Sequence, residues 1–86
     1  MVYRIEYSRD AARTLGRMPR NTAETVRSKV RALAADPLAP NNNVKKLVGR
    51  PGYRLRVGDW RVIYELEDTV RIIDVIQIAP RGGAYR

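Results

Sequence analysis

The alternation of apolar and charged residues between positions 53 and 67 constrains the fold of this chain more than any other feature. Apolar residues take every second position around Gly58-Asp59, at Tyr53, Leu55 and Val57 before it and at Trp60, Val62, Tyr64 and Leu66 after it. Such alternation is typical of half-buried strands. A two-residue connection with glycine first favours a type II′ hairpin. The turn then sets a register in which Arg56 lies directly opposite Arg61.

The first half of the chain predicts one strand and two helices. Alternation over Val2–Tyr7 indicates a strand, and Ser8 is expected to cap a helix that runs to about Arg17 and ends before Pro19. Helical spacing resumes over about Thr22–Ala35 and stops at Asp36-Pro37. Asn21 and Glu24 resemble a capping box at the start of this second helix.

The remaining segments complete the predicted order β-α-α-β-β-β. Leu38–Gly52 is loop-like, with three consecutive asparagines, and Val70–Ile78 is a β-rich strand with apolar residues at both parities. We therefore expect an α+β fold in which a helix hairpin packs on one face of a mostly antiparallel sheet. At 86 residues, the chain is expected to form one domain over positions 1–86 and to leave the other sheet face for function.

The charge of the chain predicts a polyanionic partner. Seventeen Lys and Arg against nine Asp and Glu give a net charge of +8, and only Lys29, Lys45 and Lys46 are lysines. The planar fork of arginine matches phosphate in a bidentate way. A solvated basic surface and an acidic protein partner are the alternatives, and the second is compatible with nucleic-acid binding.

The residue types that are missing narrow the chemistry. Without His or Cys the chain has no serine–histidine triad, thiol nucleophile or zinc site. Its carboxylates show no spacing for two-metal catalysis and it has no phosphate-binding glycine loop, so we expect no metal and no cofactor. The lack of cysteine, of a leader pattern and of a long apolar run predicts a cytoplasmic protein without membrane contact.

A cluster of arginines on the hairpin is the candidate functional site. Arg54 and Arg56 share a face with Arg61, and opposed arginines repel one another unless an anion lies between them. The alternative is that these side chains extend into water or pair with Glu65 or Asp74. Lys45, Lys46 and Arg50, from the preceding loop, are predicted to bind RNA. Arg81 and Tyr85 follow the last strand, where Tyr85 either packs on the core or stacks on a base.

The sequence resembles the RelE/ParE toxin superfamily over essentially its whole length. The resemblance rests on Lys46-Leu47-x-Gly49, on Tyr53 through Tyr64 and on the closing Arg81-x-x-x-Tyr85. It implies a RelE-like toxin of a type II toxin–antitoxin system, which enters the ribosomal A site and cleaves mRNA. It also implies an acidic cognate antitoxin, which supplies most of the contact with operator DNA.

The resemblance further implies a catalytic set of Arg54, Arg56, Arg61, Arg81 and Tyr85. Relatives often carry lysine in place of Arg54 and Arg56, and some have a longer spacing between the last arginine and the tyrosine. Metal-independent cleavage would leave a 2′,3′-cyclic phosphate and a 5′-hydroxyl. Because arginine is effectively never deprotonated, Tyr85 is the candidate general base and Lys46 the second. Two other functions stay open: a ParE-type inhibitor of DNA gyrase and a non-catalytic nucleic-acid-binding module.

Overall fold

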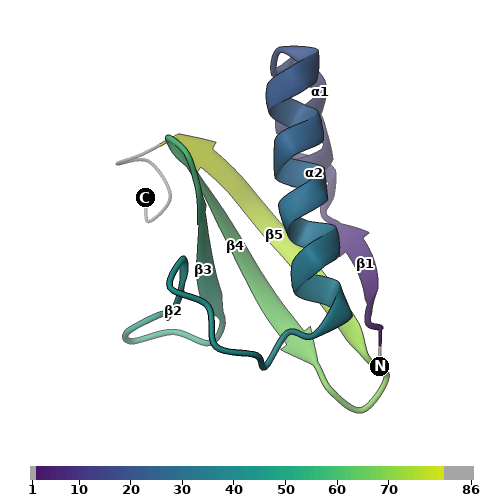
Figure 1. Cartoon of the computed structure of the whole chain (residues 1–86), viewed down its shortest axis with the longest axis vertical. Coiled ribbons are helices and arrows are strands. Elements are labelled where there is room, and N and C mark those ends of the chain that lie inside the picture. Colours follow the sequence, from purple (N-terminus) through teal and green to yellow (C-terminus); the bar gives the residue numbers. More distant parts are fainter. Residues whose placement is uncertain (1, 81–86) are drawn as a thin grey trace.

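The computed structural model describes residues 2–80, which form two helices and five strands (Figure 1). The elements in chain order are β1 (Arg4–Tyr7), α1 (Arg9–Arg17), α2 (Arg20–Ala35), β2 (Val44–Lys46), β3 (Tyr53–Val57), β4 (Trp60–Glu67) and β5 (Ile72–Pro80). The helices follow one another and α2 passes in front of the sheet in Figure 1. Within the described residues, no helix is long and apolar enough to cross a membrane.

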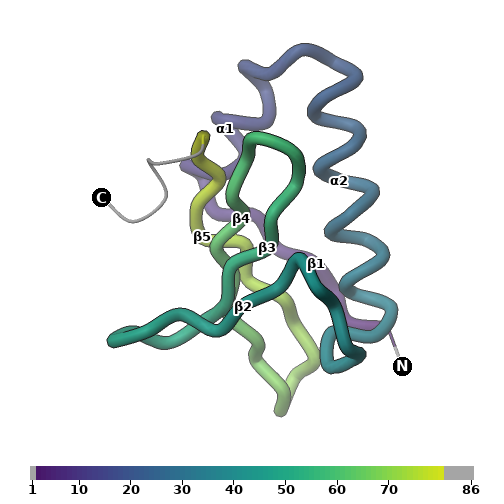
Figure 2. The backbone as a smooth tube through the Cα atoms, turned by 60° about the vertical axis from the view of Figure 1, so that its left-hand side comes forward, coloured from purple at the N-terminus to yellow at the C-terminus, as the bar shows by residue number. Residues whose placement is uncertain are grey.

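The five strands form one sheet in the order β1-β5-β4-β3-β2. Only β1 and β5 run parallel, and the three other strand pairs are antiparallel. This confirms the α+β class and the mostly antiparallel sheet. The sheet has one strand more than the sequence predicted, because the short edge strand β2 lies within the segment expected to be a loop. Figure 2 shows this edge of the sheet extending away from the helices.

The two helices begin in different ways. The Ser8 hydroxyl accepts a hydrogen bond of 3.0 Å from the Ala11 N–H, which confirms Ser8 as the cap of α1. The second helix begins at Arg20 with Pro19 as its N-cap, and no side chain caps it. Asn21 lies inside the first turn, so the predicted capping box is wrong. Proline at this position supplies the carbonyl that accepts the first helical bond, from the Ala23 N–H at 3.0 Å.

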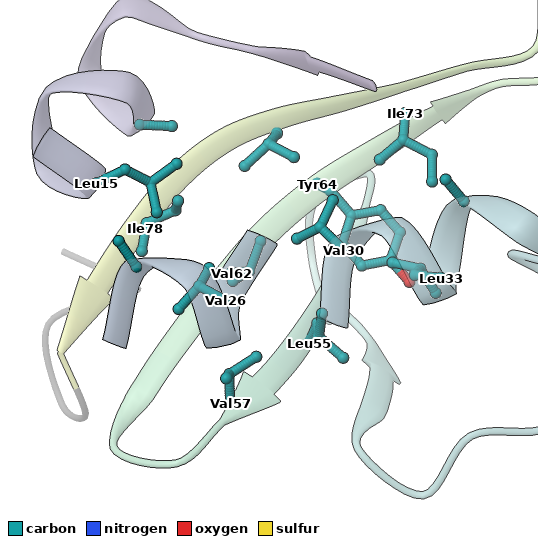
Figure 3. Close-up of a cluster of buried hydrophobic side chains, with 14 of the residues drawn as sticks. Leu15, Val26, Val30, Leu33, Leu55, Val57, Val62, Tyr64, Ile73 and Ile78 are labelled. Atoms are coloured by element: carbon teal, nitrogen blue, oxygen red, sulfur yellow. The ribbon is translucent and has the colours of Figure 1, made fainter. Parts of the chain in front are cut away.

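The main core lies between the helices and one face of the sheet (Figure 3). Val26 and Val30 of α2 are fully buried against strand residues such as Val62 and Ile73, which are also inaccessible. Burying each aliphatic side chain of this size contributes roughly 1.5–3 kcal/mol. A charge at position 30 would have no partner there, so Val30→Asp is expected to unfold the protein.

A bulge in β5 explains why apolar residues occur at both odd and even positions along this strand. The register between β4 and β5 shifts between Ile63 and Tyr64, which leaves Ile76 as an extra residue. Before the bulge Ile73 and Val75 belong to the main core, and after it Ile78 does. The strand also begins at Ile72 rather than Val70. Arg71 has a φ of 55°, which is a turn conformation, so the strand begins after it, at Ile72.

Candidate nucleic-acid interface

The β3–β4 hairpin brings two arginines directly opposite one another. Val57 pairs with Trp60, Leu55 with Val62 and Arg56 with Arg61, which confirms the predicted register. In the turn, Gly58 has φ of 57°, whereas Asp59 is not in the left-handed region. This is the combination that a type II′ turn requires. The hairpin is therefore specified by its turn and by its apolar alternation.

The arginines lie on the sheet face opposite the helices. Leu55, Val57 and Val62 face the helices, and alternate residues along a strand point to opposite faces. We call this face, opposite the helices, the open face. On it, two rows of residues run across the strands. One row contains Asn43, Arg56, Arg61 and Ala79, and the next contains Lys45, Arg54, Ile63 and Gln77. Four cations thus come from three adjacent strands within two neighbouring rows.

Arg56 and Arg61 differ in how they are held. Arg56 is exposed, whereas Arg61 is half-buried. The Nη1 atom of Arg61 donates to the carbonyl of Trp60 at 3.1 Å and lies 3.4 Å from the carbonyl of Gly58. Hydrogen bonds to the turn therefore orient one guanidinium, while the other is open to a ligand.

Three ion pairs within residues 2–80 lie elsewhere on the molecule. They join Arg4 to Glu6, Arg13 to Asp10 and Arg27 to Glu24. In residues 2–80 neither Arg56 nor Arg61 forms a salt bridge with Glu65 or Asp74. Their repulsion is thus not relieved by these acids, and a bound anion would relieve it.

The opposite end of the same face is acidic. Glu6 of β1 pairs with Asp74 of β5, which pairs with Glu65 of β4, so three carboxylates stand in one row. They line a hollow of about 320 Å³. Glu6 is paired with Arg4, so Glu65 and Asp74 are the carboxylates of this row that repel a phosphate chain and one another. The open face therefore has an acidic end and a basic end. The basic end, at the β3–β4 hairpin, is the part that can hold a polyanion.

The loop cations predicted to bind RNA are only partly brought to this face. Lys45 lines a hollow of about 180 Å³ together with Arg54 and Arg56. Lys46 lines an adjoining hollow of about 570 Å³ with Lys45 and Arg54. Arg50 is exposed in the connection between β2 and β3 and lines neither hollow.

Two asparagines in the smaller hollow are absent from the predicted site. Asn42 and Asn43 line it beside Lys45. The available signal was the run of three asparagines just before the basic Lys45-Lys46 pair. That run predicts a turn, and only the unexpected strand β2 places it next to Arg56.

Arg81 and Tyr85 lie outside the described residues, so their roles stay predictions. The last described residues of β5 reach the hairpin, since Ala79 pairs with Arg61 and Pro80 with Trp60. The end of β5, at Ala79 and Pro80, therefore lies beside the arginine pair.

Three tyrosines in the described part of the chain are poor candidates for a general base. Burial raises the pKa of Tyr64 to about 12, and burial also raises the pKa of Tyr7. A hydrogen bond to Asp68 raises the pKa of Tyr3. Each phenol therefore holds its proton more tightly than usual at neutral pH. Residues 2–80 also contain no group of three or more acidic side chains that could hold a metal ion.

A family model describes the chain from residue 5 to residue 85. It represents the ParE toxin of the type II toxin–antitoxin system parDE. The chain belongs to this family. It is thus a toxin of the RelE/ParE superfamily, as the hairpin motif indicated. No curated protein matches its sequence.

Solved structures of RelE-type toxins share the fold of this toxin. A chain of the archaeal RelE–RelB complex from Pyrococcus horikoshii is 28% identical, with a TM-score of 0.81 over 98% of this chain and 100% of that one. A chain of the RelBE2 complex from Mycobacterium tuberculosis is 20% identical, with a TM-score of 0.80 over 94% and 100%. The YoeB/ParE toxin from Agrobacterium tumefaciens is 15% identical, with a TM-score of 0.76 over 91% and 98%.

Proposed function

We propose that this toxin is a ribosome-dependent endoribonuclease that cleaves mRNA in the A site. The observation that carries the proposal is the opposition of Arg56 and Arg61 on a helix-free sheet face. Lys45 and Arg54 lie in the adjacent row. Clustered guanidinium groups, with no acid among residues 2–80 that pairs with Arg56 or Arg61, favour a bound phosphodiester. The structural similarity to RelE-type toxins supports the same function.

The chemistry needs no metal if the ribose 2′-hydroxyl attacks the adjacent phosphorus in line. The 2′-oxygen forms a bond to phosphorus, the bond to the 5′-oxygen breaks, and the products are a 2′,3′-cyclic phosphate and a 5′-hydroxyl. Arg61, fixed against the turn, and Arg56 would stabilise the additional negative charge on the phosphate oxygens. Arg81 would act near the leaving 5′-oxygen.

The general base is proposed to be Tyr85. Arginine cannot take up the proton of the 2′-hydroxyl at neutral pH. Three of the four described tyrosines, Tyr3, Tyr7 and Tyr64, have raised pKa values, which makes them less suitable. A tyrosine can act as a base where cations stabilise its phenolate. Alignment of the mRNA by the ribosome would supply a further part of the rate.

A cognate antitoxin is the proposed protein partner. The similar structures from P. horikoshii and M. tuberculosis are both toxin–antitoxin complexes. The net charge of +8 favours an acidic partner chain. An antitoxin that covers Arg56 and Arg61 would block RNA and also neutralise the repulsion between them. Contact of the complex with operator DNA would come mainly from the antitoxin.

The ParE family membership supports a second candidate function, inhibition of DNA gyrase. The two candidates differ in the polymer that is damaged. Purified toxin added to an in vitro translation reaction should cleave mRNA, which primer extension detects as stops within codons held in the A site. A gyrase inhibitor would instead leave the mRNA intact and make DNA breaks accumulate in a supercoiling reaction.

The site is tested with Arg61→Ala and Arg81→Ala in the same translation reaction. Both variants should lose most cleavage while keeping the fold by circular dichroism. Arg20→Ala is the matched control, because Arg20 is an exposed cation at the start of α2. Full cleavage by both site variants, or ends that carry a 5′-phosphate, would reject the proposal.

A further inference from the structure

Asn42 and Asn43 line a hollow beside Arg56, and the proposed cleavage chemistry gives these two asparagines no role. Asn42, Asn43, Lys45, Arg54 and Arg56 line this hollow, which has a volume of about 180 Å³. Sites for whole small molecules usually measure about 300–1,000 Å³. The hollow therefore has room for part of a ligand whose remainder lies outside it.

The backbone on one side of the hollow is fixed by hydrogen bonds. The Asn43 N–H donates to the side-chain Oδ1 of Asn41 at 2.9 Å, and the Val44 N–H donates to the Asn41 carbonyl at 3.1 Å. The Asn43 carbonyl accepts from the Arg56 N–H at 2.8 Å. This last bond ties position 43 directly to the arginine row. The turn before β2 thus holds its residues in place relative to Arg56.

The side chains of Asn42 and Asn43 have no such structural task. Both residues are exposed, and neither carboxamide forms a hydrogen bond with another residue in the described part of the chain. By contrast, the Asn41 side chain is used to close the turn. A carboxamide offers one acceptor and two donors side by side. Two such groups beside Lys45 and Arg56 therefore offer polar atoms that can recognise a neutral, hydrogen-bonding ligand.

We propose that Asn42 and Asn43 bind the edge of a purine base in the RNA whose phosphate lies on Arg56 and Arg61. The inference rests on the proposed function, because it takes RNA as the polymer on this face. Asparagine pairs in a bidentate way with N6 and N7 of adenine, and arginine pairs with O6 and N7 of guanine. Pyrimidines have no N7. A single-stranded base can present this edge to a protein.

The charges at the two ends of the open sheet face indicate where this base would lie. The paired carboxylates of Glu65 and Asp74 disfavour a phosphate chain at the far end, so the RNA backbone follows the cationic rows. Asn43 stands in the same row as Arg56 and Arg61. A base in the hollow therefore belongs to a nucleotide next to the phosphate held between the arginines. These asparagines determine specificity and have no part in the bond-breaking step.

The experiment compares wild-type toxin with Asn42→Ala/Asn43→Ala in an in vitro translation reaction, with all 5′-hydroxyl ends mapped by sequencing. Wild-type toxin should cut next to purines at least about tenfold more often than next to pyrimidines, and the double variant should lose this preference. Asn41→Ser is the matched control. Its hydroxyl still accepts from the Asn43 N–H, and Asn41 does not line the hollow, so it should keep the wild-type preference.

A binding measurement separates this inference from the proposed function. Fluorescence anisotropy is recorded with short RNA oligonucleotides whose 2′-deoxy substitutions prevent cleavage and which differ in one base. Wild-type toxin should bind the purine series more tightly, and the double variant should bind both series alike. If mRNA is not cleaved but the purine preference in binding is lost in the variant, only the nuclease proposal fails. An unchanged preference in the double variant, or no preference in wild type, overturns the base-binding site.

Discussion

The Ser8 hydroxyl donates a hydrogen bond of 2.6 Å to the Ile76 carbonyl. Ile76 is the extra residue of the β5 bulge, where the ladder between β4 and β5 is interrupted. The same hydroxyl accepts from the Ala11 N–H at the start of α1. One side chain therefore caps a helix and satisfies a carbonyl at the bulge. It joins the helix layer to the strand that leads to the arginine row.

Replacing this serine should destabilise the fold more than loss of an ordinary helix cap. A missing N-cap costs about 0.5–2 kcal/mol, and a lost hydrogen bond at a partly buried carbonyl costs about 1 kcal/mol more. We expect Ser8→Ala to lower the free energy of unfolding by about 1.5–3 kcal/mol in urea denaturation. Ser28→Ala is the matched control, because Ser28 is exposed within α2 and should change stability little. Equal effects of the two substitutions would contradict the double role of Ser8.

Tyr64 makes the fold sensitive to alkaline pH. It is 1% exposed, and its hydroxyl has no hydrogen-bond partner among residues 2–80. Burial raises the pKa of Tyr64 from 10.0 to about 12. A group whose pKa is raised by folding stabilises the fold fully below its unfolded value, and that contribution is lost as pH rises from 10 towards 12.

Tyr64→Phe should therefore remove part of the alkaline destabilisation. At neutral pH it should leave stability unchanged or raise it by about 1 kcal/mol, because an unsatisfied buried hydroxyl is removed. Thermal unfolding between pH 8 and pH 11 measures both effects. Tyr3→Phe is the comparison at neutral pH, since it removes a hydroxyl that does donate to Asp68 and should therefore not raise stability. A steeper loss of stability with pH in Tyr64→Phe than in wild type would refute the assignment.

Gly52 is required where the connection before β3 approaches β4. Its φ is 105°, and a Cβ atom there would lie 2.8 Å from the Tyr64 carbonyl oxygen. We expect Gly52→Ala to lower the free energy of unfolding by about 2 kcal/mol or more, from strain and backbone contact together. Gly16→Ala, in α1 with nothing within 4 Å, should raise it by about 0.5–1 kcal/mol. Urea denaturation of both variants gives the comparison, and a neutral Gly52→Ala would show that the connection can move away.

The parts of the fold that the sequence predicts are those with local causes. The Gly58-Asp59 turn and the alternation beside it determine the pairing of Arg56 with Arg61, so the hairpin and its cations could be predicted together. Strand β2 could not be predicted, because its three residues are too few to show alternation and lie among turn-forming residues. Its pairing depends on contacts with β3 across the intervening connection.

Two other features could not be predicted from the sequence, because they also depend on contacts between distant parts of the chain. The Ile76 carbonyl at the bulge accepts from the Ser8 hydroxyl, which is 68 positions away in the chain, and no local sequence pattern signals that contact. The part of the site contributed by Asn42 and Asn43 depends on β2, so it could not be predicted before the strand was known. The hairpin arginines were thus predictable, whereas their neighbours on the next strand were not.

The opposition of Arg56 and Arg61 predicts that RNA binding and stability respond in opposite ways to one substitution. Arg56 is exposed and stands in register with another cation. Arg56→Gln should raise the free energy of unfolding by up to about 1 kcal/mol, because like charges directly opposite each other are destabilising. The same change should weaken binding of a short RNA oligonucleotide at least about tenfold, since a charge-assisted contact to phosphate is lost. Arg20→Gln removes an equal charge from the helix layer and should change neither quantity by much. If Arg56→Gln instead lowers stability while RNA affinity is kept, Arg56 serves the fold and the phosphate lies elsewhere.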